Sequence, residues 1–108
     1  MIKKVNSIGI LGGSFDPPHK GHLFISKKSL KLLKLDKLIW AITKKNPLKN
    51  NPLLSIYKRK KLCQKIIKHE KKIKLLFLEK KIKSSSSYKL VKYFKNEGNN
   101  LIFFIIGS

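Results

Sequence analysis

The chain has 108 residues, which is enough for one small domain and too few for two, because domains usually run to roughly 100 to 200 residues. Hydrophobic residues make up 42% of the chain and charged residues 29%, a balance that is typical of globular proteins and excludes a disordered or collagen-like chain. The 26 basic residues against 5 acidic ones give a net charge of +21, which on its face favours a polyanionic partner.

Lysine carries almost all of this positive charge. Arg59 is the only arginine, and the lysines are scattered over nearly every segment. Nucleic-acid sites favour arginine for its planar fork and often interleave aromatic residues with basic ones. We therefore predict a lysine-biased, solvated surface that binds polyanions non-specifically at low salt, with no specific nucleic-acid partner.

Cysteine usage and hydropathy limit the environment of the protein. Cys63 is the only cysteine, so neither an intramolecular disulfide nor a cysteine-based zinc site can form within the chain. No apolar run reaches the length of about 18 residues that a membrane span needs, and the amino-terminal apolar stretch is too short for a signal peptide. We expect a single domain over residues 1–108, with no membrane partner and a cytoplasmic location.

The amino-terminal segment predicts a strand, a loop and a helix. Residues 4–11 predict a short buried strand because four of them are β-formers, and Gly12-Gly13 ends the strand abruptly. The loop 14–20 follows. Over residues 21–33 apolar and small side chains recur at helical spacing between lysines, which predicts an amphipathic helix. The residues at this spacing are Leu23, Ser26, Leu30 and Leu33.

The middle of the chain repeats this order. Residues 37–43 form a continuous apolar run of strand length, and a long polar loop with prolines follows it. Ser55 can cap a second helix that extends to about residue 68. Its apolar stripe consists of Leu62, Cys63, Ile66 and Ile67. Residues 73–79 then read as a third strand.

The last segment adds a third helix and a fourth strand. After a basic, serine-rich connector, Tyr88, Val91 and Phe94 indicate a helix that ends near Gly98, and residues 101–106 are apolar throughout. Strands that alternate with helices predict an α/β fold: a doubly wound parallel sheet of the Rossmann-like type, with helices on both faces.

The loop after the first strand carries the motif with chemical meaning, GGSFDPPHKGH over residues 12–22. Ligands of such sheets bind outside the carboxyl ends of the strands. The two glycines let backbone approach a ligand closely, Ser14 offers a hydroxyl, and His19 and His22 flank the start of a helix whose free N–H groups favour phosphate. Gly-Gly alone would indicate a tight turn, and one histidine alone a helix cap. Together they predict a phosphate site.

This segment, with the leucine that follows it, resembles the signature of the HxGH nucleotidyltransferases, and specifically of bacterial nicotinate-nucleotide adenylyltransferases. The paired glycines and the sequence Pro17-Pro18-His19 are typical of the nicotinate branch. TKKNPLK at residues 43–49 is similar to the family's loop after the second strand. Arg59 and Glu79 also fall where the family has an arginine and a glutamate.

The resemblance implies roles for matching positions. Ser14, His19 and His22 match residues that cradle the ATP phosphates, with the two histidines as catalytic residues, and Gly12 and Gly13 match the backbone wall of that pocket. Phe15 and Asp16 match positions that shape the loop and face the mononucleotide side. Further positions implied on that side are Lys44, Ser87, Tyr88 and Lys89. The family has threonine where this chain has Lys89, so the family's hydroxyl contact to the nicotinate carboxylate is missing here. Two alternatives stay open: Lys89 attracts the same carboxylate, or its longer side chain points into water.

The implied reaction is attack by the 5′-phosphate of nicotinate mononucleotide on the α-phosphorus of ATP, with release of pyrophosphate. Such a transfer relies on positioning and charge stabilisation, so Ser14 is not a nucleophile. Phosphates beside His19 and His22 would favour the imidazolium form. Mg²⁺ is expected as a cofactor that the ATP phosphates hold, because five acidic residues predict no dedicated protein cage.

Two alternatives remain open at this point. One is another HxGH nucleotidyltransferase, such as phosphopantetheine adenylyltransferase, and the other is an inactive basic fragment that binds polyanions. In the family the fourth strand continues into G-x-D and a later phosphate-binding element, which are absent from these 108 residues. We therefore expect an incomplete domain that is weakly active and marginally folded by itself. The preference for nicotinate over nicotinamide stays open.

Overall fold

The structure is a computed structural model that describes residues 6–13, 15–42, 54–77, 87–98 and 101–105, without the side chains of 87–90. Strands and helices alternate along the chain. In order they are β1 (Ser7–Gly13), α1 (Lys20–Leu32), β2 (Lys37–Ile42), α2 (Ile56–Ile66), β3 (Ile73–Phe77), α4 (Ser87–Asn96) and β4 (Leu101–Ile105). The predicted α/β order is confirmed, and the ends of each element differ from the prediction by a few residues.

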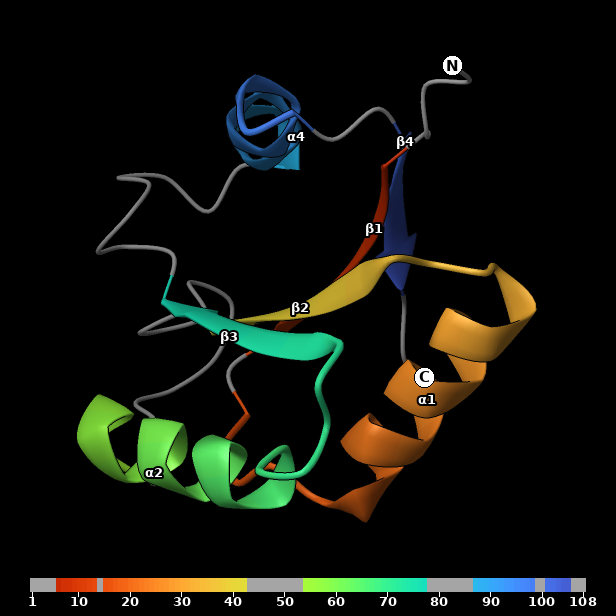
Figure 1. Cartoon of the computed structure of the whole chain (residues 1–108). Coiled ribbons are helices and arrows are strands. Elements are labelled where there is room, and N and C mark those ends of the chain that lie inside the picture. The colour runs from red at the N-terminus through yellow and green to blue at the C-terminus, as the bar shows by residue number, and fades with distance from the viewer. Residues whose placement is uncertain (1–5, 14, 43–53, 78–86, 99–100, 106–108) are drawn as a thin grey trace.

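The four described strands form one parallel sheet in the order β3-β2-β1-β4 (Figure 1). Gly13 at the end of β1 pairs with Ile42 at the end of β2, which in turn pairs with Phe77 at the end of β3. The carboxyl ends of these strands therefore lie at one edge of the sheet. The order reverses between β1 and β4, and this switch point is where sheets of this kind bind ligands.

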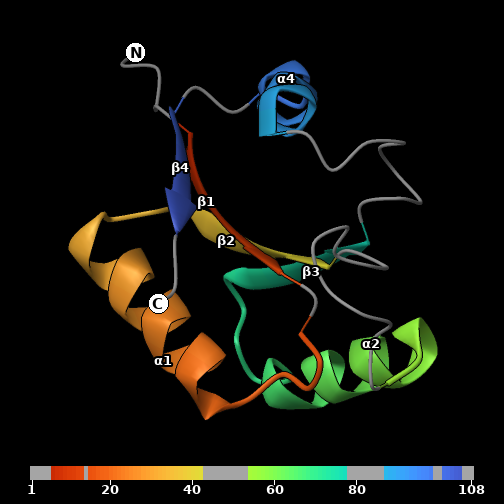
Figure 2. The same ribbon diagram turned by 180° about the vertical axis from the view of Figure 1, so that it is seen from behind.

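The helices cover both faces of the sheet, as the doubly wound prediction requires. Figure 2 shows α1 and α2 on one side and α4 on the other. Alternate residues of β1 and β2 divide between two cores. Leu11, Leu38, Trp40 and Ile42 face α1 and α2. Ile8, Ile10, Ile39 and Ala41 face Phe94 of α4.

Leu33 and Leu62 belong to the predicted apolar stripes of the first two helices, but both are exposed in the structure. Leu33 is the C-cap of α1 and is exposed, because the helix has ended there and Leu35 fills the core in its place. Leu62 is also exposed, because α2 packs through Arg59, Cys63 and Ile67, which recur every four residues along the buried side. Gly98 adopts a φ of +96° after α4, as predicted for a residue that ends a helix.

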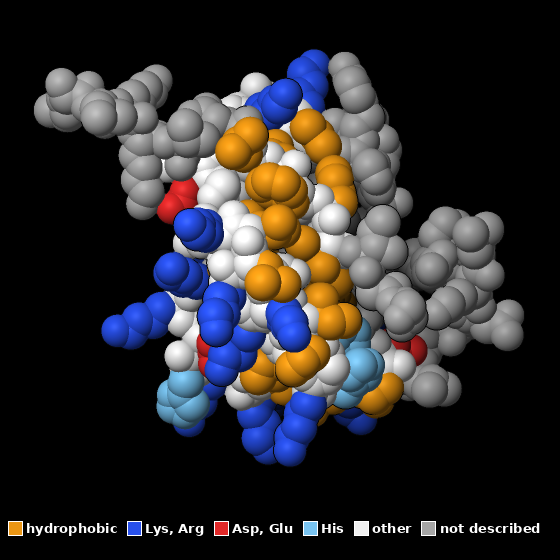
Figure 3. Space-filling view, turned by 90° about the vertical axis from the view of Figure 1, so that its right-hand side faces the viewer, with side chains coloured by type: hydrophobic (Ala, Val, Ile, Leu, Met, Phe, Trp, Pro, Cys, Tyr) orange, Lys and Arg blue, Asp and Glu red, His pale blue; other side chains and the backbone are white. Residues whose placement is uncertain are grey.

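The β4 edge of the sheet carries exposed apolar surface. Leu101 and Phe104 of β4 are about half exposed, at 48% and 41%. Figure 3 shows hydrophobic side chains gathered in a strip over this side of the molecule and bordered by lysines. An apolar edge strand of this kind favours association. Within the described residues, no helix has the length and apolar character that crossing a membrane requires.

Cys63 is buried between α2 and the sheet and is expected to be chemically inert. Burial raises the pKa of its thiol to about 12, although the nearby Arg59 lowers it. Because the thiolate is the reactive form, we expect Ellman's reagent to label the folded chain at least roughly a hundredfold more slowly than the chain in urea. Equal labelling rates in buffer and in urea would contradict this packing of α2.

Candidate phosphate-binding site

His19 and His22 hold each other at the start of α1. His19 is the N-cap with extended backbone, and its Nδ1 accepts a hydrogen bond of 3.0 Å from the Gly21 N–H. The His19 N–H in turn donates to Nδ1 of His22 at 3.0 Å. This is a capping box built from two imidazoles instead of the usual hydroxyl and carboxylate. Residues at the H-x-G-H spacing therefore form a helix start in which the two histidine side chains accept hydrogen bonds from the first backbone N–H groups.

This arrangement fixes which ring nitrogen carries hydrogen. Nδ1 of each imidazole accepts a backbone hydrogen bond, so the hydrogen of the neutral ring resides on Nε2. The ring centroids of His19 and His22 are 4.0 Å apart with planes inclined by 36°. His19 is exposed and His22 is partly buried. Two N–H donors consequently lie close together at the positive end of a helix, where an anion is favoured.

The surroundings of His22 favour its neutral form. Burial lowers the pKa of His22 from its usual value of 6.5, and the neighbouring His19 lowers it further, while the hydrogen bond to the His19 backbone raises it. An imidazolium would also carry a hydrogen on Nδ1, which here accepts one. Without ligand, His22 is therefore a neutral donor through Nε2. The imidazolium form expected beside bound phosphates stays a prediction.

This shift has a testable consequence for stability. Because the pKa of His22 is lowered by folding, the unfolded chain binds more protons than the folded chain below pH 6.5, and folding stability falls as the pH drops through the folded pKa. Between about pH 7.5 and about pH 5, we expect the urea midpoint to fall more for the native chain than for His22→Gln. An equal fall in both would show that His22 is not responsible.

Phe15 supports His22 from within the loop. It adopts a φ of 51°, a left-handed conformation that is unfavourable for a bulky residue, and yet it is 3% exposed. Its ring centroid lies 4.7 Å from His22 and 5.0 Å from the stacked ring of Trp40. Packing therefore holds strained backbone at the site, as is common where function requires it. The geometry supports the predicted loop-shaping role, and contact with a mononucleotide stays a prediction.

Asp16 fastens the same loop to the start of α2. Its Oδ1 accepts a hydrogen bond of 2.8 Å from the Leu54 N–H, and the buried Arg59 donates from Nε to the Leu54 carbonyl at 3.1 Å. One peptide segment before α2 is thus held from both sides. The sequence placed Asp16 in the motif and Arg59 in the second helix, and the structure joins them through Leu54.

The glycines leave room at the end of β1. Among the described residues, a Cβ placed on Gly12 would meet only the Ala41 carbonyl oxygen, at 4.0 Å, and one on Gly13 would meet the Phe15 ring at 3.8 Å. Gly12 is exposed, although its strand lies in the interior of the sheet. The backbone of Gly12 is accordingly open to a ligand at the switch point, as the motif predicts.

Several predicted site residues cannot be compared with the structure. Ser14 and Lys44 lie outside the described residues, as do the NPLK segment and Glu79. Ser87, Tyr88 and Lys89 form the first turn of α4, but their side chains are not described. Of the predicted set, the structure brings together His19, His22, Phe15 and the two glycines.

The comparison with protein families decides the classification. The model of the family described as "Cytidylyltransferase-like" matches residues 10–108, which is nearly the whole chain. The chain belongs to this cytidylyltransferase-like family. The matched residues include the capping box of His19 and His22.

Relatives within the family are similar over different lengths. A probable nicotinate-nucleotide adenylyltransferase from Pelagibacter ubique (strain HTCC1062) is 45% identical over 106 residues, which cover 98% of this chain and 59% of that protein. One from Ruegeria sp. (strain TM1040) is 51% identical over 63 residues, covering 58% of this chain and 33% of that protein. The resemblance to this branch is confirmed. The chain spans about a third to three-fifths of the length of these relatives.

Solved structures of nicotinic acid mononucleotide adenylyltransferases have a similar fold. Plasmodium falciparum nicotinic acid mononucleotide adenylyltransferase complexed with NaAD has a TM-score of 0.74 and 27% identity, with 92% of this chain and 50% of that chain covered. The same enzyme complexed with APC has a TM-score of 0.70 and 26% identity, with 92% and 49% covered. The predicted Rossmann-like fold of this family is therefore confirmed.

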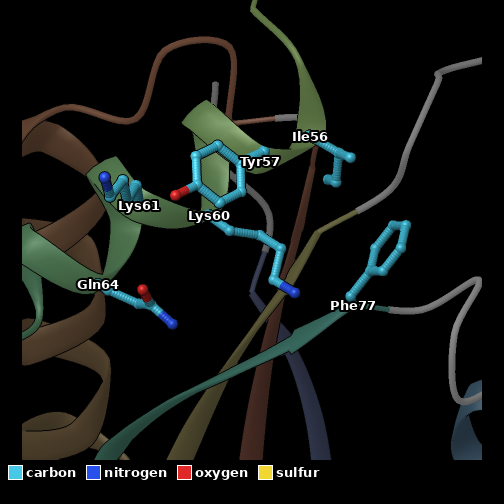
Figure 4. Close-up of a pocket in the computed structure, with 6 residues that line it drawn as sticks. All are labelled: Ile56, Tyr57, Lys60, Lys61, Gln64 and Phe77. Atoms are coloured by element: carbon cyan, nitrogen blue, oxygen red, sulfur yellow. The ribbon is translucent and has the colours of Figure 1, made fainter.

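A separate hollow lies beside α2 in this cytidylyltransferase-like chain. It has a volume of about 420 Å³ and is lined by Ile56, Tyr57, Lys60, Lys61, Gln64 and Phe77. Figure 4 shows that these side chains come from α2, over residues 56–64, and from the end of β3. Residues of the His19–His22 loop do not line it. The hollow is consequently not part of the phosphate-binding site.

Proposed function

We propose that the protein transfers the adenylyl group of ATP to nicotinate mononucleotide, as a nicotinate-nucleotide adenylyltransferase of NAD biosynthesis that acts in the cytoplasm. An oxygen of the mononucleotide 5′-phosphate attacks the α-phosphorus of ATP. The bond from that phosphorus to the bridging oxygen breaks, and pyrophosphate leaves. The products are deamido-NAD and pyrophosphate.

The observation that carries this proposal is the pair of imidazoles at the start of α1. Their centroids lie 4.0 Å apart, and their Nδ1 atoms accept from backbone N–H groups, so in the neutral rings the hydrogens lie on Nε2, where phosphate oxygens can accept them. The helix N-terminus and the open backbone at Gly12 add favourable contacts for an anion. Donors fixed in advance stabilise charge that develops on the leaving pyrophosphate.

The remaining roles follow from the resemblance and are part of the proposal. Ser14 completes the phosphate cradle, and Lys44, Tyr88 and Lys89 lie on the mononucleotide side with Ser87. Phe15 and Asp16 shape the loop between the two substrates, which is supported by the contacts of Phe15 with His22 and of Asp16 with Leu54.

We propose that the metal ion enters the site together with ATP. The described residues contain no group of three or more histidine, cysteine or acidic residues that could hold a metal ion. In this proposal the ATP phosphates hold Mg²⁺, which prefers oxygen ligands and neutralises phosphate charge. The chain supplies the imidazole donors around that complex.

Product formation tests the proposal directly. A chimera of this chain and the carboxyl-terminal part of the Pelagibacter relative is supplied with Mg·ATP and one acceptor at a time, and pyrophosphate release is measured. We expect faster release with nicotinate mononucleotide than with phosphopantetheine. A faster rate with phosphopantetheine would overturn the substrate assignment, and no release with either acceptor would overturn the reaction. The chain by itself is expected to release pyrophosphate only slowly.

A further inference from the structure

Ser26 and Trp40 form a buried hydrogen-bonded chain that ends on the backbone of His22. The indole Nε1–H of Trp40 donates to Ser26 Oγ at 2.7 Å, and the Ser26 hydroxyl donates to the His22 carbonyl at 2.7 Å. Both side chains are fully buried. The first turn of α1 is therefore attached to the middle of β2 by two short hydrogen bonds away from solvent.

The Trp40 ring also supports the His22 side chain. The indole lies edge-on to the imidazole with centroids 5.9 Å apart, and it stacks on Phe15, whose ring touches His22 from the loop side. Trp40 thus acts on His22 twice, through the backbone carbonyl and through the aromatic stack. A change at Trp40 would consequently reach both the backbone and the ring of His22.

A serine hydroxyl that bonds the carbonyl four residues earlier is common within helices and is by itself a local feature. Here the same oxygen receives a second bond from a different element. That bond turns a local contact into an attachment between α1 and β2. It also accounts for a serine at a position of the helix that otherwise faces an apolar core.

We propose that Ser26 and Trp40 are positioning residues that fix where the His22 imidazole lies relative to the strand ends. The part of this inference that concerns ATP rests on the proposed function. A small displacement of His22 would move its Nε2–H away from the phosphate oxygens, and misplacement by about 1 Å can cost about a hundredfold in rate.

The test uses the chain itself with Ser26→Ala, Ser26→Thr and Trp40→Phe. Proton NMR resolves the ring signals of the three histidines, of which His69 is exposed and far along the chain. For each variant, the His22 signal, its titration midpoint, the urea midpoint and the dissociation constant of Mg·ATP are measured. Ser29→Ala, on the same helix, is the matched control.

We expect Ser26→Ala and Trp40→Phe to move the His22 signal and its titration midpoint, to leave His69 unchanged, and to weaken Mg·ATP binding roughly tenfold. Ser26→Thr keeps the hydroxyl, so its His22 signal, its titration midpoint and its Mg·ATP dissociation constant should stay near the native values. Ser29→Ala should change none of these three quantities. If Ser26→Ala lowers only the urea midpoint and leaves the His22 signal and titration unchanged, the pair is merely structural and the inference is wrong. Should the native chain fail to bind Mg·ATP, the proposed function fails, while the His22 signals still decide this inference.

Discussion

Replacing His22 with alanine is expected to lower adenylyl transfer by the chimera about 10²- to 10³-fold, the usual loss when one preorganised donor to developing charge is removed. The substitution removes an Nε2–H donor and also the Nδ1 atom that accepts from the His19 N–H. The effect should appear mainly in kcat and in Mg·ATP binding. Steady-state pyrophosphate release and calorimetric titration of Mg·ATP measure the two quantities.

The matched control for this substitution is His69→Ala. His69 is an exposed histidine beyond the end of α2, so it tests for a general effect of losing an imidazole from a highly basic chain. We expect native rates for His69→Ala, and duplex DNA binding that is nearly unchanged in both variants because lysines dominate it. If His22→Ala weakens DNA and ATP binding equally, His22 has no specific role at a nucleotide site.

Gly21→Ala is expected to separate stability from function. A Cβ on Gly21 would lie 2.7 Å from Cε1 and 2.8 Å from Nδ1 of the His19 ring, so the ring must move. Alanine is favoured over glycine in a helix by about 1 kcal/mol, and a lost N-cap costs about the same. The free energy of unfolding should therefore stay within about 1 kcal/mol of native. Transfer by the chimera should nevertheless fall roughly tenfold or more, because His19 is displaced.

Urea unfolding and pyrophosphate release are measured on the same preparation of Gly21→Ala. The matched control is Gly98→Ala, at a glycine with a φ of +96° where an added Cβ would meet no atom of the described residues within 4 Å. Gly98 is also distant in sequence from the loop. That variant should lose stability through backbone strain and keep its transfer rate when folded. Native turnover by Gly21→Ala would contradict the placement of the His19 ring over Gly21.

Much of the fold follows from local patterns. The apolar runs predict the strands, because central parallel strands are buried on both faces and need no alternation. The pair Gly12-Gly13 marks the end of the first strand. The exposed Leu33 and Leu62 show the limit of helical spacing. Leu33 lies at the end of α1, which helical spacing alone does not locate. Whether Leu62 or the adjacent Cys63 faces the core depends on the rotation of α2 against the sheet, and contacts between residues distant in sequence, such as Asp16 and Leu54, help to set that rotation.

The site was predictable to the extent that its residues are neighbours in sequence. His19, Gly21 and His22 form the capping box among themselves, so their spacing alone indicates the helix start. The support that Trp40 gives to His22 could not be predicted in this way, because Trp40 is distant in sequence from the loop. A tryptophan within an apolar run predicts core, and nothing in the sequence indicates that its N–H reaches α1 or that Phe15 takes a left-handed conformation above it.

The central claim is that the two imidazoles of the capping box bind the ATP phosphates through Nε2–H. Proton–nitrogen correlation spectra of the histidine rings, recorded as Mg·ATP is added to the chain, test it most directly. We predict that the Nε2 signals of His19 and His22 shift together and saturably, and that His69 does not change. Shifts of His69 equal to those of the pair, or the same shifts of His19 and His22 with duplex DNA, would contradict it.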